Sequence, residues 1–226
     1  MTWDWLIHSD AGLALRIGVG AAIFAILALI DLARNGRHAT RWREYALLLI
    51  AAVVAMAFGA INDVITSSIS WEYFYYGKGL SEQLGPTVPP DPSRLQAAAA
   101  LVGVKASWSA GLIIAVALLL ANNPSKRLPR LRNRSLLIYL PIALTCVIVG
   151  GVLGGLTGYA GLPTHWNTDF AEMLQRDEMR PRRFMATYGV HLGEYLGGAV
   201  GMILALGLIR RRRRRRQRSA PVPAAV

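Results

Sequence analysis

The segment YALLLIAAVVAMAFGAINDVITSSI, residues 45–69, is apolar from its first residue almost to its last. It is longer than the ~20 residues that a helix needs to cross the hydrocarbon of a bilayer. Its only charged residue, Asp63, lies near the far end beside Asn62 and several hydroxyl side chains. The segment therefore predicts a membrane-spanning helix, and the carboxylate inside it calls for an explanation.

Four other apolar runs have a similar length. The chain of 226 residues is 54% hydrophobic with a mean hydropathy of +0.36, and this content lies in runs at about 12–33, 45–69, 96–121, 136–158 and 186–209. The first run is followed by an arginine-rich loop and has no basic segment before it, so we interpret it as a retained helix and not as a signal peptide. We predict an all-α fold, a polytopic transmembrane helical bundle of about five spans in one domain over residues 1–209. Residues 210–226 are predicted to be a basic, disordered tail.

Basic residues gather on one side of the predicted spans. They cluster in the connections 34–43 and 126–134 and again after the fifth span. The positive-inside rule then predicts an outer N-terminus and a cytoplasmic C-terminus in a bacterial-type inner membrane. The run from Arg210 to Arg218 directly follows a span, so we interpret it as a topology determinant that attracts anionic lipid headgroups. That interpretation is favoured over binding of nucleic acid.

Two longer connections, about 71–95 and 159–185, fall on the outer side. The first begins with five aromatic residues in six, from Trp71 to Tyr76, which is typical of an aromatic belt at the membrane–water interface. In the second, Asn167 or Thr168 could cap a short helix whose apolar face carries Phe170, Met173 and Leu174. We expect this helix to form a partial lid.

The fourth and fifth predicted spans carry glycines at helical spacing. The rows are Gly150, Gly154 and Gly158 on one span and Gly189, Gly193, Gly197 and Gly201 on the other. Small residues let helix backbones approach closely in lipid, where packing drives association. We expect these two spans to pack together, and glycine-rich faces could also serve a homo- or hetero-oligomer.

Ionisable side chains recur at one predicted depth. Counting 1.5 Å per residue from the cytoplasmic end of each span puts Arg16, Asp63 and His191 at roughly 27 Å. Lys105 comes out at about 24 Å and Glu194 at about 22 Å on the same scale. Charged groups inside a membrane face the bundle interior or a water-filled cavity, so this layer predicts a shared polar site near the outer surface.

The helical faces suggest roles for these groups. Asp63, Lys105, His191 and Glu194 are the candidate catalytic residues; Arg16, Thr66, Ser67, Glu72, Tyr188 and Tyr195 are the candidate substrate-binding residues. A carboxylate tuned by burial could act as a base, and His191 could move protons. The alternative is a structural salt-bridge cluster that only orients the helices.

A divalent metal is a further alternative. Asp63, His191 and Glu194 could supply three ligands, as in an open zinc site, with His165 of the outer loop as a fourth candidate. Lys105 and Arg16 at the same level would repel a cation, and no HExxH motif is present. The cofactor therefore stays open. The chain has no phosphate-binding P-loop and no G-x-S-x-G motif.

Glu72 needs separate treatment. It lies nine residues beyond Asp63, on the opposite helical face. It is either a surface residue of the aromatic belt or, if the helix breaks within the hydroxyl-rich residues 66–70, a residue folded over the site.

Two short segments carry a resemblance. The motif T-x-x-I-S-x-E-Y-F (Thr66 to Phe74) and the motif H-x-x-x-Y-x-G-G (His191 to Gly198) resemble a functionally uncharacterised group of multi-span bacterial membrane proteins. Trp71 stands where that group has proline, which affects the expected bend. The resemblance implies no activity, but it implies that Glu72 and His191 belong to one site.

Three functional hypotheses follow. The first is an outward-facing ionisable pocket that handles a small polar or ionic ligand by acid–base or metal-assisted catalysis. The second is a non-catalytic structural subunit of a larger membrane complex, and the third is an ion- or proton-coupled transporter. The inner halves of the spans are almost purely apolar, which counts against transport.

Overall fold

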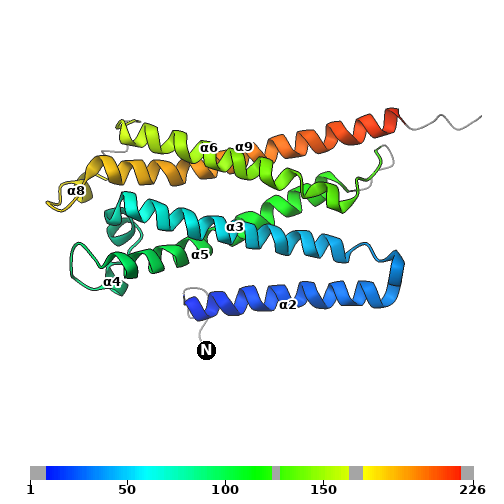
Figure 1. Cartoon of the computed structure of the whole chain (residues 1–226), viewed down its shortest axis with the longest axis horizontal. Coiled ribbons are helices and arrows are strands. Elements are labelled where there is room, and N and C mark those ends of the chain that lie inside the picture. The colour runs from blue at the N-terminus through cyan, green and yellow to red at the C-terminus, as the bar shows by residue number, and fades with distance from the viewer. Residues whose placement is uncertain (1–8, 124–127, 163–169, 220–226) are drawn as a thin grey trace, which may run out of the picture.

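The computed structural model describes residues 9–123, 128–162 and 170–219, which form helices and no strand (Figure 1). The long helices are α2 (Asp10–Asn35), α3 (Trp42–Ile69), α5 (Pro92–Ala121), α6 (Tyr139–Tyr159) and α9 (Pro181–Arg218). The short elements are η1 (Gly36–His38), the π-helical turn η2 (Tyr73–Gly77), α4 (Ser81–Leu84), η3 (Asn133–Leu136) and α8 (Ala171–Leu174). The predicted all-α bundle is thereby confirmed.

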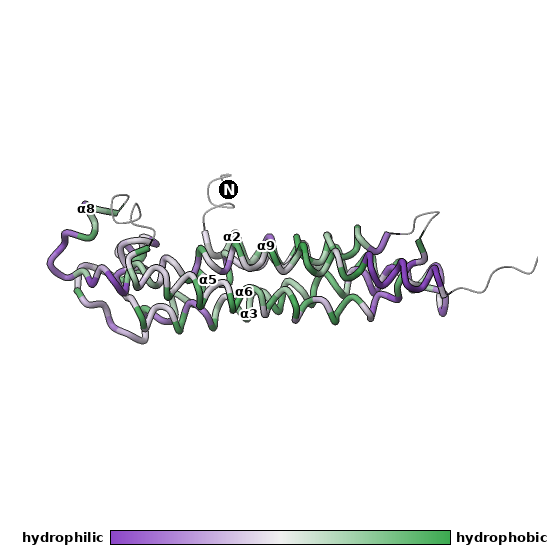
Figure 2. The backbone as a smooth tube through the Cα atoms, turned by 90° about the horizontal axis from the view of Figure 1, so that it is seen from above, coloured by the Kyte–Doolittle hydropathy of each residue, from purple (hydrophilic) through white to green (hydrophobic). Residues whose placement is uncertain are grey.

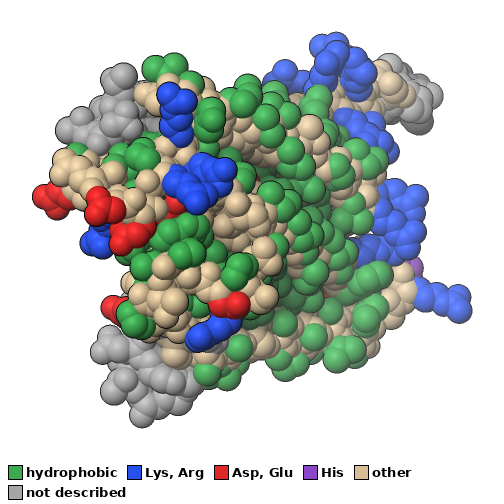
Figure 3. All heavy atoms as spheres, turned by 60° about the vertical axis from the view of Figure 1, so that its left-hand side comes forward, with side chains coloured by type: hydrophobic (Ala, Val, Ile, Leu, Met, Phe, Trp, Pro, Cys, Tyr) green, Lys and Arg blue, Asp and Glu red, His purple; other side chains and the backbone are tan. Residues whose placement is uncertain are grey.

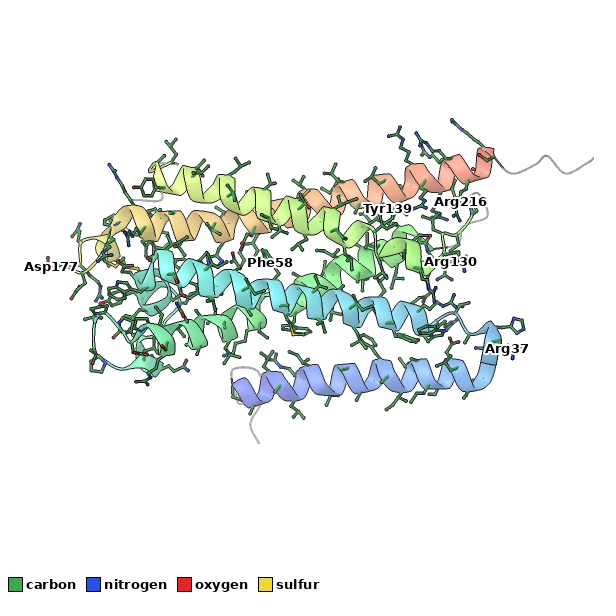
Figure 4. All side chains as sticks on the ribbon, in the orientation of Figure 1. Arg37, Phe58, Arg130, Tyr139, Asp177 and Arg216 are labelled. Atoms are coloured by element: carbon green, nitrogen blue, oxygen red, sulfur yellow. The ribbon has the colours of Figure 1, made fainter. Side chains whose placement is uncertain are left out.

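The five long helices of the described chain are each long and apolar enough to cross a membrane. Their apolar stretches line up in one band, with polar segments at both ends (Figure 2). On the face shown in Figure 3, apolar side chains cover the surface between the ends. Arg37, Arg130 and Arg216 lie at one end, here called the basic end, and Asp177 lies at the opposite end (Figure 4). The protein is therefore built as a multi-pass membrane protein.

The helices form two antiparallel pairs and one outlier (Figure 1). Helices α6 and α9 pack along their lengths, and so do α3 and α5. Helix α2 lies on the outer side of α3, where Phe24 stacks on Tyr45 with ring centroids 5.9 Å apart. Most of the other side chains of α2 face outward, as a helix surrounded by lipid requires.

Glycine explains the close packing of α6 on α9. Gly150 lies against Gly193, Gly154 against Gly189, and Gly158 against Met185, with the backbones in direct contact. The expected association of the fourth and fifth spans is confirmed. These glycines contact each other within one chain, so the same faces are not open to a partner helix.

Small residues also bring the backbones of α3 and α5 close together, at fewer positions. Gly59 lies against Gly103, and Gly111 lies against Ala51. Ser107 also reaches this contact, where its hydroxyl donates to the Gly103 carbonyl at 2.6 Å. Sequence reasoning missed this interface because it considered glycines alone, whereas alanine and serine complete the rows here: Ala51, Ala55 and Gly59 on α3 and Gly103, Ser107 and Gly111 on α5.

The basic end is organised by a buried arginine. Residues 210–218, predicted to be disordered, instead continue α9 as helix to Arg218. Arginine is a good helix former, and the Arg213 guanidinium is buried against the connection between α5 and α6. It donates to the carbonyls of Ala121, Asn123, Leu128 and Pro129 at 2.6–2.9 Å. Arg213 is therefore an anchor of the fold and not a headgroup contact, whereas its neighbours Arg214, Arg215 and Arg216 are exposed.

The opposite end holds an aromatic core. Tyr73, Phe74 and Tyr75 are buried together with Phe184 and Met185 of α9, so the expected interfacial belt is instead part of the interior. This correction has a local cause: α3 ends at Ile69 and Ser70 is extended (φ −142°, ψ 103°), which turns the aromatic residues inward.

The connection before α9 partly agrees with its prediction. The short helix α8 is present, and Phe170, Met173 and Leu174 pack against the aromatic core. None of them lines the cavity described below, so the partial lid stays a prediction. The predicted capping residues Asn167 and Thr168, and His165, lie outside the described residues.

Candidate functional site

A cavity of about 330 Å³ lies between the two helix pairs. Helices α3 and α5 form one wall, α6 and α9 form the other, and Lys78 from the turn after η2 reaches its rim. Phe58, labelled in Figure 4, lies on the α3 wall. The volume is at the lower end of the range for small-molecule sites.

Polar side chains from both walls meet at one end of this cavity. His191 of α9 lies between two carboxylates: its Nε2 is 3.9 Å from Asp63 Oδ1, and its Nδ1 is 3.6 Å from Glu194 Oε2. The Asn62 amide donates to Asp63 Oδ1 at 3.3 Å and to Glu194 Oε2 at 3.2 Å. The structure thus brings together three of the four candidate catalytic residues.

The geometry around His191 leaves one nitrogen unsatisfied. His191 is only 8% exposed, and its Nε2 is buried without a hydrogen-bond partner. Both carboxylates lie slightly beyond hydrogen-bond distance. Buried polar atoms in native proteins are nearly always bonded, so an unbonded ring nitrogen on a cavity wall marks a place for another group.

An aromatic residue from η2 fixes the His191 ring. Tyr73 stacks on it with centroids 5.0 Å apart and planes inclined by 13°. Burial raises the pKa of the Tyr73 hydroxyl above its ordinary value, so this ring stays neutral beside the histidine. Phe74 meets the same imidazole edge-on at 6.0 Å. The break after α3 therefore determines the orientation of the histidine.

Lys78 is a site residue that sequence reasoning missed. Its ammonium lies 5.4 Å from the centre of the Tyr73 ring, and it lines the cavity beside the carboxylates. In the sequence it lies fifteen residues beyond Asp63, in an extramembrane loop. Only the turn formed by η2 brings it back, and no pattern in the sequence indicates that turn.

Lys105 and Arg16 lie at other depths than predicted. The register Gly59–Gly103 and Gly111–Ala51 puts Lys105 opposite residue 57, roughly 9 Å nearer the basic end than Asp63. The stacking of Phe24 on Tyr45 likewise puts Arg16 opposite residue 53, roughly 15 Å from the level of Asp63. Neither side chain is among those that line the cavity. The depth scale failed because the helices do not begin at one common plane.

The hydroxyls of α3 bond to their own helix. Thr66 donates to the Asn62 carbonyl at 2.9 Å, and Ser67 donates to the Val64 carbonyl at 2.8 Å. Both side chains are buried and neither lines the cavity. Self-bonding of this kind accounts for the polar stripe without assigning it a ligand.

Glu72 is buried, as the helix-break interpretation requires. It has no exposed surface, and its Oε2 accepts a hydrogen bond from Ser70 at 2.8 Å, while Oε1 has no hydrogen-bond partner. It does not line the cavity, but the next residue, Tyr73, stacks on His191. Glu72 therefore adjoins the candidate site from outside its wall.

The two candidate tyrosines have different positions. Tyr195 lines the cavity and is 62% exposed on its outer side. Tyr188 instead packs edge-on against Phe170, with ring centroids 4.9 Å apart, in the aromatic core. Only Tyr195 is thus placed to meet a ligand.

The candidate metal ligands do not share a binding point. Asp63 faces Nε2 of His191 and Glu194 faces Nδ1, so an ion bound to either nitrogen would reach only one carboxylate. Among the described residues, no group of three histidine, cysteine, aspartate or glutamate side chains could hold a metal ion. The arrangement fits proton exchange between a histidine and two carboxylates better than metal ligation.

Comparison of the chain with protein-family models, curated proteins and solved structures finds no match. The class of the protein therefore follows from its architecture: it is an all-α, multi-pass membrane protein with a cavity between two helix pairs.

Proposed function

We propose that the chain is an integral protein of the cytoplasmic membrane whose cavity binds a ligand from the outer side and carries out acid–base chemistry on it. The observation that supports this most directly is the placement of two carboxylates on the two nitrogens of one buried histidine. A neutral imidazole can accept a proton on one nitrogen and release one from the other.

The side chains of this cluster come from different helix pairs. Asp63 comes from the α3–α5 pair, whereas His191 and Glu194 come from α9. The gap of 3.9 Å between His191 and Asp63 crosses from one pair to the other and would close with a small movement of one pair against the other. The gap of 3.6 Å between His191 and Glu194 lies within α9 and would close by rotation of the side chains. Catalytic hydrogen bonds are often long before a ligand binds. Ligand binding between the pairs could therefore complete the chain of proton donors and acceptors.

Two alternatives receive less support. A cluster that only orients helices would be expected to satisfy its buried nitrogen, and His191 Nε2 is unsatisfied. A transporter needs polar groups along the whole path, but the cavity wall toward the basic end is mainly aliphatic, with Ser107 as an isolated polar residue. The geometry thus favours a site that opens to one side.

The acid–base proposal predicts that Asp63 and Glu194 titrate as a coupled pair. Infrared difference spectra across a pH titration of the protein in nanodiscs would follow their carboxyl bands. We expect Asp63→Asn to remove one band and to move the midpoint of the Glu194 band by about one pH unit or more. The exposed-loop variant Asp177→Asn should leave both midpoints unchanged. A Glu194 band with the same midpoint in Asp63→Asn as in the wild type would refute the proposal.

The proposed orientation predicts which end reacts with an impermeant thiol reagent. In a Cys146→Ala background, which removes the only native cysteine, Lys78→Cys should be labelled in intact cells. Arg216→Cys should be labelled only after permeabilisation, because the positive-inside rule puts the basic end in the cytoplasm. The reverse pattern would show that the cavity faces the cytoplasm.

A further inference from the structure

The cavity is polar at one end only. Beyond Asp63, Asn62 and His191 its walls continue along α3 to Ala51 and along α9 to Met202. The stretch from Asp63 to Ala51 is roughly 18 Å of α3, and the stretch from His191 to Met202 is roughly 16 Å of α9. Over this length the lining is mainly small and aliphatic, as at Ala55, Ala110 and Ala199. A small ion would not need such a groove. Apolar cavities hold no ordered water, so an apolar group is what fits here.

The groove is also open toward the lipid. Val54, Ile113 and Tyr195 line it and are 40%, 61% and 62% exposed, on helices whose outer surfaces are apolar. A molecule dissolved in the bilayer could therefore enter sideways between the helix pairs. Entry from lipid needs no polar channel, which agrees with the apolar walls.

The polar end of the cavity determines which head group a bound ligand can have. Asp63, Glu194 and His191 line this end of the cavity, and the Asn62 amide already donates to both carboxylates. The ammonium of Lys78 at the rim is one further donor, against two carboxylates. Hydrogen-bond acceptors are therefore in excess, and a bound head must supply donors. An anionic head would meet two carboxylates and only one ammonium, that of Lys78, in a largely apolar cavity that screens their charges poorly.

From this complementarity we propose that the ligand is a single-chain amphiphile whose head donates hydrogen bonds and carries no negative charge, such as a primary amine. Its hydrocarbon chain lies in the groove toward the basic end, and its head lies between Asp63 and Glu194. This assignment rests on the proposed function, because it gives the chemical class of the molecule on which the acid–base groups act.

The test uses dodecylamine with a photoreactive diazirine in its chain, added to the full-length protein in phosphatidylcholine nanodiscs. Crosslinks identified by mass spectrometry should fall on the groove-lining segments of α3, α5, α6 and α9. Excess 1-dodecanol should compete, and excess dodecanoate should not. Efficient competition by dodecanoate would overturn the head-group assignment.

Two pairs of variants separate tail from head. Ala110→Trp fills the groove from an exposed position on α5, and it should abolish the groove crosslinks. The matched control Leu120→Trp lies on the same helix at a lipid-facing position, where Leu120 is 67% exposed, and it should leave them unchanged. Asp63→Asn should lower the apparent affinity by about tenfold, the effect of losing ~1.4 kcal/mol.

The outcomes distinguish the two proposals. Wild-type crosslinking in Ala110→Trp would overturn the amphiphile assignment, and unchanged affinity in Asp63→Asn would overturn the placement of its head. In either case the infrared titration, which contains no amphiphile, decides independently whether the acid–base cluster exists.

Discussion

Arg213→Ala is expected to lower the free energy of unfolding by about 3–5 kcal/mol. The Arg213 guanidinium is buried and donates to four backbone carbonyls at the end of α5 and in the connection to α6. Removing it takes the charged donor away from all four carbonyls at once. Because a single side chain makes these bonds, their contributions are not additive, and the total stays within the stated range. Thermal unfolding of detergent-purified protein should show a midpoint on the order of 10 °C lower.

The arginine run supplies its own control. Arg214→Ala removes the same charge from the adjacent position, but that side chain is exposed, so its midpoint should stay close to wild type. Arg213→Lys keeps the charge and loses the planar donor group, so it should also be destabilised. Equal midpoints for Arg213→Ala and Arg214→Ala would mean that the run acts only through its charge.

The basic run shows what composition can predict and what it cannot. Its position after an apolar span predicts a cytoplasmic end, and the apolar bundle was predictable from run length alone. The continuation of α9 as helix through residues 210–218 was not predicted. Nothing distinguishes Arg213 from its neighbours in the sequence, because its role depends on which residue of α9 faces the α5–α6 connection. That face is set by the pairing of α6 with α9.

The candidate site was predictable to a similar extent. Asp63, His191 and Glu194 could be identified because charged residues are rare and costly within a span. Lys105 is equally costly by that rule, yet it lies nearer the basic end and off the cavity wall. Depth in a span does not follow from counting residues when the helices begin at different levels. The position of Lys78 depends on the turn formed by η2, for which the sequence has no local signal. The break at Ser70 did have one, the hydroxyl-rich residues 66–70.

Gly154→Ala is the second substitution with a large expected effect. A Cβ atom at this position would meet the Gly189 carbonyl and, at 3.0 Å, the Cα atom of Gly193. These are backbone atoms, so the helices must separate to admit the methyl group. Overpacking of this kind costs about 1–3 kcal/mol. Unfolding by a denaturing detergent, followed by circular dichroism, should begin at a lower denaturant fraction.

Gly207→Ala provides the matched substitution on the same helix pair. No atom lies within 4 Å of a Cβ built at Gly207, so the variant should be neutral or more stable by about 0.4–1 kcal/mol through the lower entropy of its unfolded chain. If both variants behaved alike, close approach of the backbones would not be what holds α6 on α9.

Gly154→Ala should also change the geometry of the candidate site. Helix α9 carries His191 and Glu194, and its position is set by the glycine contacts with α6. Displacing α9 would change the gap of 3.9 Å between His191 and Asp63, which belongs to the other helix pair. Gly154→Ala should therefore weaken the coupled titration of the two carboxyl groups, whereas Gly207→Ala should preserve it. A destabilised Gly154→Ala variant with intact coupling would show that the cluster is held by the opposite end of the molecule, where Tyr73 stacks on His191, and not by the glycine contacts.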